Sequence, residues 1–251
     1  MAFPLIMAAP NGARRSSKDH PAIPVTIAET VETAIACQQA GAAALHLHVR
    51  DEQEKHSLDA GLYREALGEM ERALPGFPVQ VTTESAGVFT PEEQLALLQE
   101  LKPKWASVAL RELAVAPDLA RRFYAEAAEM GTELQHIVFD AADAQILARL
   151  QRAGVLSETE SVILVLGRYT ADFQSDARDL APLLAALPPV GKWMLCAFGR
   201  DEHRCLLEAA RLGGDLRVGF ENSTTQETGA AWPDNAASIA ALIERLPAEV
   251  E

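Results

Sequence analysis

Cysteine is scarce in this 251-residue sequence, and long apolar runs are missing from it. The three cysteines are an odd number without a C-x-x-C motif, which excludes a disulfide framework and indicates a reducing compartment. No apolar stretch approaches the roughly 20 residues that span a bilayer. The first apolar segment follows no basic region, so a signal peptide is not expected. We therefore expect a cytoplasmic protein without a membrane partner.

Basic residues are also in deficit. The 22 lysines and arginines are outnumbered by 36 acidic residues, which leaves a formal net charge of −14. Such a surface repels a polyanion, and no cluster of basic residues offsets it, so nucleic acid is excluded as a partner. A local basic pocket could still take a small anion.

The chain instead contains eight apolar β-type segments that alternate with alanine-rich helical segments. They lie at residues 3–9, 43–49, 77–83, 104–110, 133–139, 161–167, 192–199 and 216–222. Strict alternation predicts a parallel sheet, and eight units favour closure into a (β/α)8 TIM barrel. An open doubly wound sheet is the alternative, but no G-x-G-x-x-G follows the first strand. No low-complexity linker interrupts the chain, so residues 1–251 are expected to form a single domain.

One of these segments, "LHLHVRD" at 45–51, carries polar residues at alternate positions. Side chains alternate along a strand, so His46, His48 and Arg50 are expected to share one face, opposite an apolar face. The polar residues stand at the carboxyl end of the strand, where barrel enzymes build their active sites. Two histidines at this spacing can converge on one metal ion.

A third ligand is available on the last predicted strand, "LRVGFEN". Arg217 and Glu221 are expected on its inner face, with Glu221 at the carboxyl end. In a closed barrel this strand and the His46–His48 strand both flank the first strand, so Glu221 can reach the same ion. Imidazole and carboxylate ligands suit Zn²⁺. The remaining histidines are predicted to be structural or surface residues: His20, His56, His136 and His203.

Several segments together resemble the β-keto acid cleavage enzymes, the group that includes 3-keto-5-aminohexanoate cleavage enzyme. They are "APNGA", "PAIPVT", "AGAAALHLHVRD" and "RVGFEN", and the resemblance extends from residue 8 to about 245. It implies a (β/α)8 barrel, a Zn²⁺ ion and a homotetramer. It also implies condensation of a β-keto acid with acetyl-CoA to give acetoacetate and a new acyl-CoA.

The resemblance also assigns roles to individual residues. It makes His46, His48 and Glu221 the metal ligands and Arg217 the arginine that orients the substrate and the catalytic carboxylate. Thr82 and Ser107 approximately match hydroxyl positions that contact substrate, although each hydroxyl could equally serve a neighbouring backbone group. Asn11, Arg14 and Arg50 are expected to join Ser107 in substrate binding, and Thr82 and Asn222 to join Arg217 in catalysis.

The sequence departs from the family pattern at several places, and two of them bear most directly on the reaction. Asn222 follows Glu221 where the family usually has aspartate, and an asparagine cannot act as a general base. Arg14 and Arg15 stand where the family often has an acid, which favours a negatively charged keto acid. Two alternatives therefore stay open: another metal-dependent C–C lyase or hydrolase on the same barrel, and a non-catalytic relative that binds metal or acyl-CoA.

Overall fold

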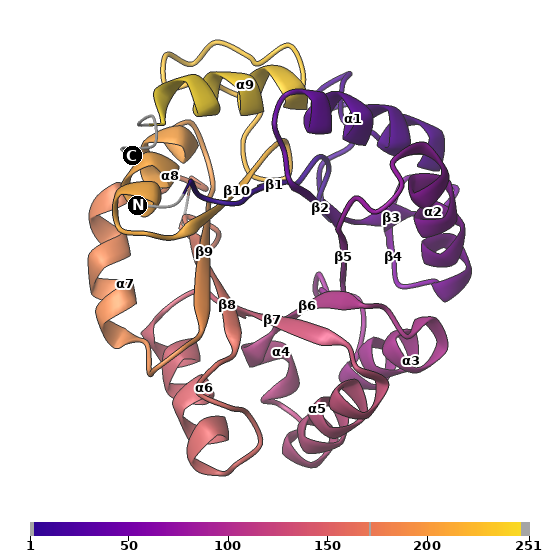
Figure 1. The fold of residues 1–251 in the computed structure, drawn as a ribbon, viewed down its shortest axis with the longest axis vertical. Coiled ribbons are helices and arrows are strands. Elements are labelled where there is room, and N and C mark those ends of the chain that lie inside the picture. Colours follow the sequence, from indigo (N-terminus) through magenta and orange to yellow (C-terminus); the bar gives the residue numbers. More distant parts are fainter. Residues whose placement is uncertain (1–2, 171, 247–251) are drawn as a thin grey trace.

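Eight parallel strands close into a barrel in the computed structural model, which describes residues 3–170 and 172–246. Around the barrel the strands follow the order β1-β10-β9-β8-β7-β6-β5-β2 (Figure 1). The predicted (β/α)8 TIM barrel is thereby confirmed. The bounds of the strands are β1 Ile6–Ala8, β2 Ala44–Leu47, β5 Val79–Thr82, β6 Trp105–Ala109, β7 Glu133–Val138, β8 Ser161–Leu166, β9 Lys192–Ala197 and β10 Asp215–Val218.

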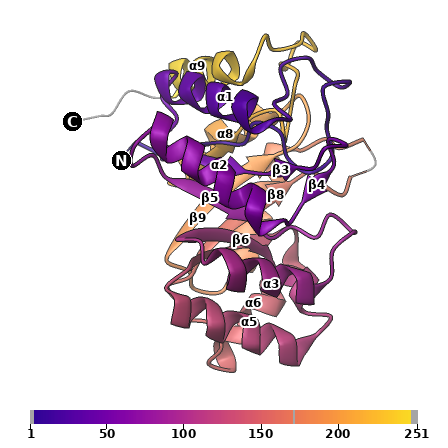
Figure 2. The same ribbon diagram turned by 90° about the vertical axis from the view of Figure 1, so that its right-hand side faces the viewer.

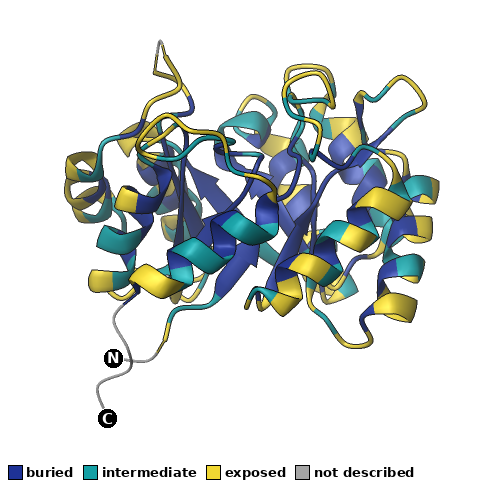
Figure 3. Ribbon diagram, turned by 90° about the horizontal axis from the view of Figure 1, so that it is seen from above, coloured by how far each residue is buried: buried dark blue, intermediate teal, exposed yellow. Residues whose placement is uncertain are grey.

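The helices form an outer layer around this barrel, and Figure 2 shows α1, α2, α3 and α5 along one side. Their inner faces are buried against the strands and their outer faces are exposed (Figure 3). None of the described helices combines the length and apolarity needed to cross a bilayer. The bounds are α1 Ile27–Gln39, α2 Ala60–Ala73, α3 Pro91–Leu101, α4 Leu110–Leu113, α5 Pro117–Met130, α6 Ala141–Arg152, the 3-10 turn η1 Ala177–Asp179, α7 Leu180–Ala186, α8 Glu202–Arg211 and α9 Asn235–Arg245.

Local sequence determines where helices begin. α1 starts at a capping box in which the Thr26 hydroxyl accepts from the Glu29 N–H and the Glu29 carboxylate accepts from the Thr26 N–H. α3 starts in the same way at Thr90, with Pro91 in its first turn. These caps satisfy backbone N–H groups that the first helical turn leaves free.

The pairing of β1 with both β2 and β10 decides where the site forms. Ala8 pairs with Leu45 on one side and with Val218 on the other. The carboxyl ends of β2 and β10 therefore lie two strands apart at one end of the barrel, where the βα loops gather.

The segment predicted as one strand at 43–49 is divided in the structure. β2 ends at Leu47, and a short hairpin follows, in which β3 (Val49–Arg50) pairs antiparallel with β4 (His56–Ser57). The hairpin lies at the loop-bearing end of the barrel (Figure 2). The alternation rule therefore applies to His46 but not to Arg50, whose direction is set by the hairpin rather than by the barrel strand.

Candidate active site

Three predicted ligands meet at the carboxyl ends of β2 and β10. His46 Nε2 and His48 Nε2 lie 3.1 Å apart, and each lies 3.7 Å from Glu221 Oε2. All three ligand atoms lie within 4.8 Å of one another, a cluster that could hold a metal ion. The two histidines are buried and the Glu221 side chain is only 10% exposed, so the cluster is not a chance gathering of solvated groups.

The two histidines are neutral, which is the form that binds a metal. Burial lowers the pKa of His46 to about 4 and, with His46 beside it, lowers the pKa of His48 well below its ordinary value. His46 Nδ1 lies 2.8 Å from Oε1 of Gln80, an amide oxygen that can only accept. The Nδ1 therefore carries the proton, and Nε2 presents a lone pair toward Glu221.

Glu221 lies in the turn after β10 and is held as a carboxylate by Arg217 of that strand. Burial would raise its pKa, but Arg217 and His46 hold it below the usual range. Arg217 donates to Oε1 over 3.1 Å, whereas the buried Oε2 accepts no hydrogen bond from any described residue. An unpartnered carboxylate oxygen facing two imidazole lone pairs fits a cation at this point.

Gly12 makes room for this carboxylate. Its φ of +63° lies in the left-handed region, and a Cβ at this position would overlap Cγ of Glu221. The "NGA" segment after β1 thus requires glycine for both its turn and its approach to Glu221.

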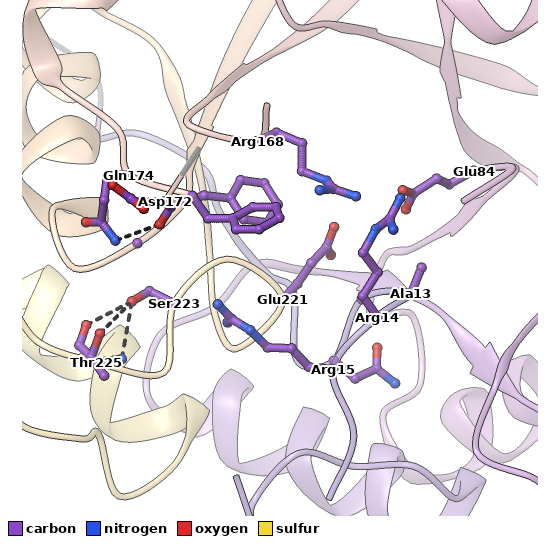
Figure 4. Close-up of a pocket in the computed structure, with 15 residues that line it drawn as sticks. Ala13, Arg14, Arg15, Glu84, Arg168, Asp172, Gln174, Glu221, Ser223 and Thr225 are labelled. Carbon is purple, nitrogen blue, oxygen red and sulfur yellow. Dashed lines mark hydrogen bonds between the residues drawn. The ribbon is translucent and has the colours of Figure 1, made fainter. Parts of the chain in front are cut away.

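A cavity of about 400 Å³ opens beside the cluster. Figure 4 shows Arg14 and Arg168 directed toward Glu84 and Glu221. Asn11 also lines this cavity; its amide N–H groups donate to the carbonyls of Pro24 and His48, while its buried Oδ1 has no partner among the described residues. A small recess behind the cavity is lined in part by His46, Thr82 and Arg217.

The two predicted hydroxyl residues lie side by side on adjacent strands. Ser107 Oγ donates to Thr82 Oγ1 over 3.3 Å, and Thr82 Oγ1 also accepts from the Glu84 N–H. Thr82 reaches the recess, whereas Ser107 does not line either hollow. Ser107 thus contacts the site through Thr82.

Arg50 and Asn222 point elsewhere. The Arg50 guanidinium donates to the backbone carbonyls of Asn11, Gly12 and Arg15 and so ties the loop after β1 to the hairpin. Asn222 is fully buried and donates to Glu202 Oε1 and to the Arg217 carbonyl, each over 3.1 Å. These contacts give both residues a role in holding the loops that carry the site.

Glu84 and Arg168 are charged residues of the cavity that were not predicted from the sequence. Glu84 follows β5, and its Oε2 lies 4.0 Å from His48 Nε2; burial, with Glu221 and Glu112 nearby, raises its pKa to about 7. Arg168 follows β8 and is 9% exposed, with its guanidinium carbon 5.4–5.6 Å from three aromatic ring centroids. Each comes just after the carboxyl end of a barrel strand, so applying that rule to every strand would have found them.

His56 and Gln80 also contact the two histidines of the cluster. His56, predicted to be structural or on the surface, is buried with its Nδ1 3.4 Å from His48 Nδ1. Gln80 holds His46, as described above. Neither carries a motif of its own, because the contact depends on how β5 and the hairpin pack against β2.

A (β/α)8 barrel with a His-His-Glu cluster beside an arginine-lined cavity defines a class of metal-assisted barrel enzymes. The model of the β-keto acid cleavage enzyme family matches residues 4–249. The chain therefore belongs to the β-keto acid cleavage enzyme family, and both the predicted resemblance and the prediction of an enzyme of this kind are confirmed.

Curated relatives agree with this assignment over nearly the whole chain. The chain is similar to 3-keto-5-aminohexanoate cleavage enzyme of Fusobacterium nucleatum, with 27% identity covering 96% of this chain and 89% of the relative. It is also similar to 3-oxoadipate:acetyl-CoA acetyltransferase of Cupriavidus necator, with 28% identity covering 96% of this chain and 88% of the relative.

Solved structures show the same fold at low sequence identity. ObcA bound to oxaloacetate superposes with a TM-score of 0.68 and 18% identity, covering 89% of this chain. The chain spans 63% of the length of ObcA. A type I 3-dehydroquinate dehydratase from Clostridium difficile superposes with a TM-score of 0.64 and 11% identity, covering 98% of this chain and 94% of that one. These likenesses show the barrel fold.

Proposed function

We propose that this enzyme condenses a β-keto acid with acetyl-CoA and releases acetoacetate and a new acyl-CoA. The observation that carries the proposal is the His46–His48–Glu221 cluster facing a cavity in a chain that matches the family model almost end to end. A relative at 28% identity is named as an acetyl-CoA acetyltransferase of 3-oxoadipate. We infer that small-molecule keto acid and acetyl-CoA are the partners of this chain.

We infer that Zn²⁺ is the metal, because two neutral imidazoles and one carboxylate are a ligand set of catalytic zinc sites, which keep a position open for substrate. Bound there, the ion would supply Lewis-acid stabilisation of negative charge on a keto acid oxygen. Arg217 fixes the Glu221 carboxylate through Oε1 and leaves Oε2 directed at the two histidines. We infer that Thr82, which lines the recess, contacts the substrate carboxylate.

We infer that the preferred keto acid carries a second negative charge. Arg14 and Arg168 line the cavity and point toward Glu84 and Glu221, but neither lies within ion-pair distance of a described carboxylate. Arg15 also lines it but donates to the carbonyls of Phe220 and Asn222. Two unpaired guanidinium groups near a metal site would hold a distal carboxylate, such as the second carboxylate of 3-oxoadipate.

The test combines metal analysis with a substrate panel. Purified protein should contain about one zinc per chain, and His46→Ala and Glu221→Ala should lose it. The zinc protein should convert keto diacids with acetyl-CoA to acetoacetate and a new thioester. Turnover without acetyl-CoA would favour a lyase or hydrolase, and thermal stabilisation by acyl-CoAs without product would favour a binding protein.

A further inference from the structure

We propose that His56 is a positioning residue that fixes the tautomer of His48, so that Nε2 of His48 presents a lone pair to the metal. The inference rests on the proposed metal site and assigns a role to a residue outside its ligand set. The evidence is the pair of hydrogen bonds that His56 forms with His48 and with the Glu84 carbonyl.

The hairpin delivers His56 to this place. β4 pairs antiparallel with β3, with His56 opposite Arg50, and this register brings the His56 ring over His48 with 4.9 Å between ring centroids. His56 Nδ1 lies 3.4 Å from His48 Nδ1, and His56 Nε2 lies 2.8 Å from the Glu84 carbonyl oxygen. The ring is 9% exposed, so water does not replace these partners freely.

The direction of each bond follows from its acceptor. A backbone carbonyl can only accept, so His56 Nε2 carries a proton. His56 is buried and its Nδ1 faces another imidazole rather than a carboxylate, so the ring is neutral and its Nδ1 is bare. That Nδ1 can only accept, so His48 Nδ1 is the donor. His48 is neutral as well, and its Nε2 is left with the lone pair.

The opposite tautomer is disfavoured at the same contact. A proton on His48 Nε2 would leave two bare Nδ1 atoms, of His48 and His56, facing each other at 3.4 Å. Their lone pairs would repel, although the proton could then donate to His46 Nε2 over 3.1 Å. A cation bound between the two Nε2 atoms removes that alternative and makes the tautomer with the proton on Nδ1 the stable one.

His46, the other histidine ligand, is oriented in a similar way, but its partner is an amide rather than an imidazole. Gln80 accepts from His46 Nδ1 and donates to Gln135 Oε1 over 3.0 Å, which orients its amide. These two contacts therefore leave both Nε2 lone pairs, 3.1 Å apart, for one cation, whose positive charge offsets their mutual repulsion. Partners of this kind commonly contribute a factor of about 10 to 100 to metal affinity.

The test compares three variants for Zn²⁺ affinity by competition with a chromophoric chelator, and for the visible spectrum of the Co²⁺-loaded protein. His56→Leu removes the acceptor and should weaken Zn²⁺ binding about 10- to 100-fold and alter the Co²⁺ bands. His56→Gln retains an acceptor and a donor and should restore affinity to within a few fold. His203→Leu is the control, a buried histidine bonded to Ser238 and stacked on Trp232.

The outcomes separate the two proposals. Wild-type affinity in His56→Leu, with tight binding by the parent protein, would overturn the role of His56 and leave the metal site standing. Equal weakening in all three variants would show a structural effect and also overturn it. Failure of the parent protein to bind Zn²⁺ would overturn the metal site itself.

Discussion

At the scale of the residue, each metal-binding side chain uses one polar atom for a protein partner and leaves another free to bind the metal. Glu221 uses Oε1 for Arg217 and keeps Oε2 for the histidines, and each histidine uses Nδ1 for a protein partner and keeps Nε2. Such a division follows from the number of donors and acceptors on each group. Substitutions that move one of these atoms should therefore affect metal binding more than stability.

Gly12→Ala should test this for Glu221. The added Cβ would displace the Glu221 side chain, so we expect zinc affinity to fall by about tenfold or more, measured by chelator competition. Gly76→Ala is the matched control, because Gly76 also has a positive φ, +75°, but has open space around it. Equal zinc affinity in both variants would contradict the role assigned to Gly12.

Arg14→Ala should change substrate preference. We expect kcat/KM for a keto diacid to fall about tenfold or more, with a smaller effect on a neutral β-keto acid, because one cation of the cavity is lost. Steady-state kinetics with both acids checks this. Arg121→Ala, an exposed arginine on α5, should leave both values unchanged. A loss that is equal for the two acids would show that Arg14 does not read the distal charge.

At the scale of the element, short polar sequences determine where helices begin, and the β3–β4 hairpin brings His56 to the site. The Thr90–Glu93 capping box satisfies two backbone N–H groups at the start of α3. Thr90→Ala should lower the free energy of unfolding by about 1 kcal/mol, measured by urea denaturation, with little change in zinc content. An unchanged free energy would show that the Glu93 carboxylate alone suffices.

At the scale of the whole molecule, a buried carboxyl group couples stability to pH. Burial raises the pKa of Glu202 to about 8, although contacts with Gly219 and Asn222 favour its ionised form. The folded state therefore retains a proton that the unfolded state has lost above about pH 4.5. This contribution to stability is present at low pH and is lost as pH rises through about 8.

Comparison of the parent protein with Glu202→Gln should reveal this coupling. Between pH 7 and pH 9 the parent should lose roughly 1 kcal/mol more unfolding free energy than the variant, whose side chain does not titrate. Urea denaturation at the two pH values measures the difference. Parallel losses in both proteins would place the titration elsewhere.

The assembly also belongs to this scale. The family resemblance predicts a homotetramer, so light scattering should give about four times the 27.1 kDa chain mass. A mass of one chain would contradict that prediction.

Much of this could be predicted from local patterns. Alternating β and helical segments predicted the barrel, and period-two alternation placed His46 and His48 at a strand end with Glu221 two strands away. These inferences succeed because backbone periodicity and barrel closure leave few arrangements. The alternation rule failed to predict the direction of Arg50, because β2 ends before this residue and Arg50 belongs to the β3–β4 hairpin.

The sequence by itself determined the eight-unit order, the helix caps and the identity of the residues able to bind a metal. Only the tertiary structure decided which partner each of these residues meets: Gln80 for His46, His56 for His48 and Glu202 for Asn222. The physical reason is that propensity and periodicity act over a few neighbouring residues. Hydrogen-bond direction in a buried site depends on side chains that packing brings together from distant strands.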